Sequence, residues 1–127
     1  MTNTDHAIHT LLWSEMTDDG QQMSRIDATV STELRERIAA DLADFTEKAI
    51  AMGFDPGEQL AVMLHPDNDG DPWNQVAHDF ILTRNHHGAG FWDGDWRQPW
   101  GDRMTELAHT YGEINCYVGD DGFVYSL

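Results

Sequence analysis

The sequence predicts an α+β fold: a single compact domain with one long amphipathic helix, several short helices and a small antiparallel sheet that includes a C-terminal hairpin. Apolar residues recur every three or four positions over residues 32–52, and further stretches with this period carry helix-capping residues at their ends. Apolar residues also alternate on both sides of a turn at 119–122. We expect residues 1–30 to form an N-terminal helix and loop, 31–112 a mainly helical body, and 113–127 the hairpin.

The first element is a short helix over residues 5–15, in which Ala7 and Leu11 share one face and Thr4 serves as N-cap. The polar stretch 16–27 is predicted to be a loop.

The long helix follows, with Ser31 as its N-cap and Gly53 as the left-handed residue that ends it. Its apolar positions form one stripe, which predicts a face packed against the core. These positions are Leu34, Ile38, Leu42, Phe45, Ala49 and Met52.

Asp55 is an N-cap candidate for a short buried helix over 56–64, although so short an apolar run is also compatible with a strand. Residues 65–71 form an acidic loop, and Asp71 caps a helix that Gly88 ends. The alternative keeps only 72–78 helical and makes a hairpin of the residues that follow. We favour the helix because its start signal, apolar stripe and stop signal agree.

Residues 89–100 hold three of the five tryptophans, interrupted by glycine and proline, and are not a regular helix. A helix over 100–111 follows, with Gly112 as its stop. Two strands alone are marginal in water, so the hairpin needs a helix over one face or a third strand. Residues 89–92 are the candidate third strand.

The charge of the chain restricts its partners. It has 127 residues with 23 Asp and Glu against 7 Lys and Arg, a formal net charge of -16. Such a surface repels nucleic acid and anionic membranes and attracts basic proteins. The same composition is typical of proteins adapted to high salt, in which the acidity has no binding role.

Three other features bound the setting. The single cysteine, Cys116, rules out an internal disulfide and agrees with a reduced intracellular compartment. No apolar run has the length of a membrane span, and the N-terminal residues do not resemble a signal peptide. Cys116 alternates with apolar neighbours, so we expect it to face the core as an inert residue.

A metal site is the sharpest catalytic alternative. Six side chains of ligand types lie close together in the sequence, but their spacing is not diagnostic, since there is no His-Glu-x-x-His motif and no cysteine pair. They are His78, Asp79, His86, His87, Asp93 and Asp95, and a small metal-dependent enzyme or sensor would use His78, Asp79, His87 and Asp93.

The acidic loop resembles the start of a calcium-binding loop, but that motif fails downstream. Counting from Asp67, Pro72 stands at the sixth position, where the motif has glycine, and His78 stands at the twelfth, where it has an acid. We expect a solvated acidic turn. No nucleophile elbow, phosphate-binding loop or dinucleotide-binding glycine pattern is present, and no cofactor is expected.

The second half of the chain resembles a family of small acidic proteins encoded by bacteriophages and related mobile elements. The motifs that carry the resemblance are HDFILTRNHHGAGFWD at 78–93 and YVGDDGFVY at 117–125, within a similarity over roughly residues 7–126. The family usually has a small residue where His86 stands, and the stretch 95–100 departs from its pattern. The family has no established activity, so the resemblance implies a phage setting, in which small acidic proteins often bind host proteins.

We therefore expect a non-enzymatic accessory protein that binds and inhibits a basic host protein in the host cytoplasm. The target would be a nucleic-acid-handling defence component of CRISPR or restriction type. Carboxylates three or four residues apart on a helix lie about 5–6 Å apart, a scale that lets them imitate nucleic-acid charge. The candidate contacts are Asp41, Asp44, Glu47, Asp67, Asp69, Asp71, Trp92, Asp93, Asp95 and Trp96. Whether the tryptophans belong to the core or anchor a partner is left open.

Overall fold

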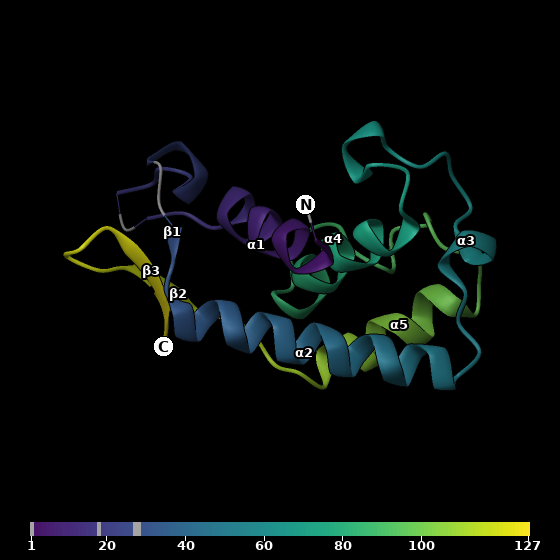
Figure 1. The fold of residues 1–127 in the computed structure, drawn as a ribbon. Coiled ribbons are helices and arrows are strands. Elements are labelled where there is room, and N and C mark those ends of the chain that lie inside the picture. The colour runs from purple at the N-terminus through teal and green to yellow at the C-terminus, as the bar shows by residue number, and fades with distance from the viewer. Residues whose placement is uncertain (1, 18, 27–28) are drawn as a thin grey trace.

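The computed structural model describes residues 2–17, 19–26 and 29–127, and confirms the α+β class. Helix α2 runs along one side, with α1, α4 and α5 packed near it and a small sheet at one end (Figure 1). The α-helices are α1 (Asn3–Ser14), α2 (Thr32–Ala51), α3 (Pro56–Gln59), α4 (Pro72–Arg84) and α5 (Trp100–His109). Two short 3-10 helices, η1 (Met23–Ile26) and η2 (Pro66–Asn68), and the strands β1 (Thr29–Val30), β2 (Cys116–Val118) and β3 (Phe123–Ser126) complete the fold.

Helix α1 begins earlier than predicted, because Thr2 and not Thr4 caps it. The Thr2 hydroxyl accepts a hydrogen bond from the Asp5 amide at 3.0 Å, and the Asp5 carboxylate accepts one from the Thr2 amide at 2.9 Å. This reciprocal pair satisfies two amides that the helix itself leaves free.

Helix α2 agrees with its prediction. The Ser31 hydroxyl accepts a hydrogen bond from the Leu34 amide at 3.1 Å, and Gly53 has the left-handed φ of 93° that ends the helix. Met52, which was placed on the buried stripe, is 42% exposed. The other predicted positions are buried: Leu34, Ile38, Leu42, Phe45 and Ala49.

Helix α3 is shorter than the predicted 56–64. After Gln59 the backbone becomes extended, and Leu60 forms an antiparallel bridge with Trp96. The Ala61 amide donates to the Asp95 carbonyl at 2.7 Å, so the backbone bonds that would extend the helix are used by the later loop. Met63 is consequently 94% exposed.

Helix α4 confirms the helical interpretation and excludes the hairpin. The residue that turns the chain at its end is His86, with a left-handed φ of 56°, and not Gly88. Asn85 then joins the end of α4 to the segment before β2, because its side chain accepts from the Ile114 amide at 2.8 Å and donates to the Ile114 carbonyl at 3.2 Å.

The predicted third strand was wrong. The sheet order is β1-β3-β2, with β1 parallel to β3 and β2 antiparallel to it, so the sheet is mixed. Residues 89–92 pack instead against α4, where the Phe91 amide donates to the Thr83 hydroxyl at 3.0 Å.

The C-terminal hairpin is confirmed, and its inner face is set by Val124, which is fully buried. The alternating residues Phe123 and Leu127 are 43% and 84% exposed, and Tyr125 stacks on Tyr117 with ring centroids 5.6 Å apart. Cys116 is only partly buried, on the inner side of β2.

A buried arginine joins three parts of the fold. The Arg84 side chain is 0% exposed and lies over the Phe80 and Tyr111 rings. Its guanidinium donates to the Asp41 carboxylate at 3.0 Å, to the Gly112 carbonyl at 2.8 Å and to the Tyr111 carbonyl at 3.0 Å. One side chain of α4 therefore provides hydrogen-bond donors to a carboxylate of α2 and to two carbonyls of the segment after α5.

Replacing Arg84 with methionine should lower the free energy of unfolding by about 3 kcal/mol, because it leaves the partly buried Asp41 carboxylate without its closest cation and two carbonyls without donors. Urea unfolding measures this. The exposed Arg97 provides the matched control, since Arg97→Met should change stability by less than about 0.5 kcal/mol. Equal effects of the two variants would contradict the role given to Arg84.

Gly90 and Gly88 should respond differently to alanine. Gly90 has a φ of 156°, and a Cβ there would overlap the Thr83 hydroxyl that holds the Phe91 amide. A Cβ at Gly88 meets nothing within 4 Å. Thermal unfolding should show a lower melting temperature for Gly90→Ala by about 4–8 °C or more and little change for Gly88→Ala.

Candidate binding cleft

The acidic group predicted on α2 does not present a row of free carboxylates. Asp41 accepts from Arg84 at 3.0 Å and lies 4.0 Å from Arg37. Asp44 accepts from the Tyr111 hydroxyl at 2.6 Å and pairs with Lys48 at 2.9 Å, and these contacts, the Tyr111 bond foremost, lower the pKa of Asp44. Only Glu47, exposed beside a shallow groove between α1 and α2, has no such partner among the described residues.

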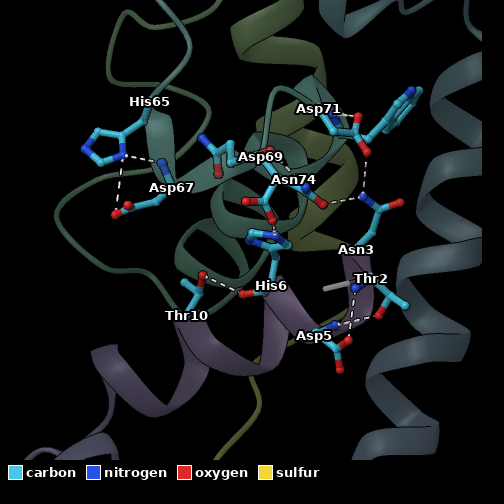
Figure 2. A network of polar contacts seen from close by, with 12 residues as sticks. Thr2, Asn3, Asp5, His6, Thr10, His65, Asp67, Asp69, Asp71 and Asn74 are labelled. Atoms are coloured by element: carbon cyan, nitrogen blue, oxygen red, sulfur yellow. Dashed lines mark hydrogen bonds and ion pairs between the residues drawn. The ribbon is translucent and has the colours of Figure 1, made fainter.

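The acidic loop, residues 65–71, is fastened to α1 and α4 (Figure 2). The Asp71 carboxylate caps α4 by accepting from the Trp73 amide at 3.0 Å, and it also accepts from the Asn3 side chain at 3.3 Å. Asp69 lies 3.2 Å from Nε2 of His6. Asp67, by contrast, has a side chain that is 89% exposed.

The tryptophan segment divides between core and surface. Trp96 is 2% exposed and its indole N–H donates to the Asp79 carboxylate at 2.6 Å, so it is not available to a partner and its assignment to the binding surface is corrected. Large aromatic side chains usually pack in this way. Trp92 is 49% exposed.

Asp93 and Asp95 form a close pair. The Asp93 carboxylate accepts from the Gly90 amide at 3.3 Å and from the Asp95 amide at 3.2 Å, and so shapes the turn. Burial, and then the neighbouring Asp93, raise the pKa of Asp95.

The structure does not bring the six predicted metal ligands together. Among the described residues, no group of three or more His, Cys, Asp or Glu side chains has the geometry to hold a metal ion. Asp79 faces Trp96, His86 stacks on His109 with centroids 4.6 Å apart, and His87 lies 3.2 Å from Glu15.

A cleft of about 740 Å³ opens between α1, the acidic loop and α4. Its lining is unusually rich in imidazoles, because four of the seven histidines meet there. The side chains that line it are His6, His9, Thr10 and Trp13 of α1, His65, Pro66, Asp67, Asn68 and Asp69 of the loop, Gln75 and His78 of α4, and Asp95.

The hydrogen bonds of the cleft favour one tautomer of the His78 ring. The Thr10 hydroxyl donates its one proton to the His6 carbonyl at 2.9 Å, so it can only accept from Nδ1 of His78, also at 2.9 Å. Burial lowers the pKa of His78. At neutral pH the ring is therefore neutral, with its proton on Nδ1 and a lone pair on Nε2, which has no partner among the described residues.

Three carboxylates line the cleft beside the four histidines, without any Lys or Arg. Residues 49–83 contain no Lys or Arg, and none of the residues that line the cleft is Lys or Arg. Asp67, Asp69 and Asp95 contribute carboxylates from the loop and from the opposite segment. A cation entering the cleft would be attracted from more than one side.

Sequence reasoning named Asp67, Asp69, Asp95 and His78 but missed the α1 contribution of His6, Thr10 and Trp13. The available signal was the spacing of His6, His9 and Trp13, which places them near one another on a helix. Nothing in the sequence indicated that this face of α1 lies opposite the acidic loop.

Comparison with protein-family models, with curated proteins and with solved structures finds no match to this chain. The resemblance to small acidic phage proteins accordingly stays a prediction. No helix within the described residues combines the length and apolar character needed to cross a membrane.

Asp79 should make stability depend on pH. Its side chain is buried, which raises its pKa from 3.8 to about 7 in spite of the hydrogen bonds from Trp96 and Gln75. Because the folded state then binds more protons than the unfolded state between these two pH values, the contribution of Asp79 falls as pH rises through that interval.

Asp79→Asn should therefore gain stability relative to the natural protein as pH rises from about 5 to about 8, by more than about 1 kcal/mol. Urea unfolding at the two pH values measures the difference. Parallel pH curves for both proteins would contradict the role of Asp79.

Proposed function

We propose that this protein is a non-enzymatic module that binds a basic segment of another protein at its acidic loop and the adjoining cleft. The observation that carries the proposal is the separation of charge. The 35-residue stretch 49–83 has carboxylates but no Lys or Arg, while four of the seven basic side chains lie on or beside α2.

Those basic side chains are already neutralised within the fold. Arg35 pairs with Asp5 at 3.1 Å, Lys48 with Asp44 at 2.9 Å, and Arg84 with Asp41 at 3.0 Å. Intramolecular cations therefore cancel part of the acidity of α2, whereas the carboxylates of the loop have only histidines and amides as neighbours. An external cation has most to gain at the loop.

The proposed partner is a host protein with a basic, nucleic-acid-binding surface, in the cytoplasm of the host cell. The net charge of -16 supports such a partner, and the resemblance to phage proteins suggests that binding inhibits it. Asp41 and Asp44 of α2 already pair with basic side chains within the fold. We therefore place the carboxylates that would imitate phosphates in the loop and the cleft, and not on α2.

A fluorescein-labelled arginine-glycine-serine repeat peptide tests this by anisotropy at low and at physiological salt. Binding should weaken as salt rises. Asp67→Asn with Asp69→Asn should reduce affinity about tenfold at low salt, since two exposed ion pairs contribute up to about 1 kcal/mol each. Asparagine also tolerates the left-handed φ of 54° at Asp69.

Glu33→Gln with Glu36→Gln is the matched control, because it removes the same charge from exposed positions on α2. It should change affinity by less than about threefold. Equal losses from both double variants would mean that net charge alone governs binding. Absence of any salt-dependent binding, together with unfolding at low salt, would favour the environmental explanation of the acidity.

A further inference from the structure

We propose that the cleft between α1, the acidic loop and α4 is a pocket for an arginine side chain of the partner. This inference rests on the proposed function and identifies the group that is recognised. It draws on four features of the cleft: its carboxylates, the exposed indole of Trp13, the imidazole of His78 and its volume.

The carboxylates come from two separate segments of the chain, so that a planar cation with several donors can be bound from more than one direction. Asp67 and Asp69 reach the cleft from the acidic loop, and Asp95 reaches it from the segment that pairs with Leu60. A guanidinium has five N–H donors in a rigid plane, so acceptors on separate elements can be engaged together.

Asp95 would gain from a bound cation. Its partial burial and its neighbour Asp93 both oppose ionisation, and none of the residues that line the cleft is a Lys or Arg that could pair with Asp95. A guanidinium beside Asp95 would offset both effects.

Trp13 supplies an aromatic surface at the edge of the cleft. Its side chain is 50% exposed, and its ring lies 6.1 Å from the His78 ring, tilted by 35°. A guanidinium is weakly hydrated and stacks on aromatic faces, and it would cover apolar surface that is otherwise open to water.

His78 adds an acceptor without adding positive charge. Thr10 holds its proton on Nδ1, so the lone pair on Nε2 is free to accept from an N–H donor. A lysine ammonium also donates hydrogen bonds, but it is compact and strongly hydrated and gains less from the indole. The volume of about 740 Å³ leaves room for neighbouring atoms of the partner chain.

The experiment compares three peptides of one repeat sequence, with arginine, lysine or citrulline at the variable position, binding to the natural protein. The arginine peptide should bind about threefold to tenfold more tightly than the lysine peptide, and the uncharged citrulline peptide should not bind. In NMR spectra, the arginine peptide should shift the Trp13 indole and His78 imidazole signals. This measurement needs no variant.

Trp13→Ala and Trp92→Ala form a matched pair, since the two side chains are 50% and 49% exposed and only Trp13 lines the cleft. Trp13→Ala should abolish the preference for arginine over lysine, with a loss of about threefold to tenfold in affinity for arginine, and Trp92→Ala should do neither.

Equal affinity for the arginine and lysine peptides, with no shift at Trp13 or His78, would overturn the arginine pocket. If the double variant Asp67→Asn with Asp69→Asn still weakened binding of both peptides, the proposed function would stand although the arginine pocket would not. A loss caused by Trp92→Ala instead of Trp13→Ala would move the contact to the tryptophan loop and also overturn the pocket. Failure of every basic peptide to bind would overturn both proposals.

Discussion

The fold depends on the buried guanidinium of Arg84. Removing this cation from water is costly, and the cost is offset only because a carboxylate of α2 and two carbonyls after α5 are fixed around it. The same geometry determines where α2, α4 and the chain leading to β2 lie relative to one another. It also explains why Asp41, although acidic and on a helix surface, is unsuited to recognising a partner. Its carboxylate already pairs with the buried guanidinium of Arg84.

The polar residues that follow His78 also have a structural role. Asp79 accepts from Trp96, Thr83 holds the Phe91 amide, and Asn85 pairs with both backbone groups of Ile114. Gly90 is needed where the loop passes close to Thr83. A concentration of histidine, aspartate and aromatic residues that suggests chemistry thus serves mainly to attach an irregular loop to a helix. Of these side chains, His78 is the one whose ring remains open to a cleft.

Local rules predicted the helices well, because caps and apolar periodicity act within a few residues. Ser31, Gly53, Asp55 and Asp71 were identified by this means. Interactions between distant segments were not predictable from local signals. The parallel pairing of β1 with β3 and the bridge from Leu60 to Trp96 join residues far apart in sequence. The cleft likewise depends on contacts between distant segments. Its acidic residues could be recognised in the sequence, but the sequence did not indicate that α1 lies opposite the loop.

The attachment of the acidic loop is almost wholly polar. His6 contacts Asp69, Asn3 donates to Asp71 and to Asn74, and Asn68 donates to Gln75, whereas the apolar side chains of α1 pack on α4 beneath. Exchanging a few such bonds for bonds to water involves little free energy compared with opening the core. A ligand entering the proposed pocket would therefore displace this loop at less cost than it would displace α1 or α4.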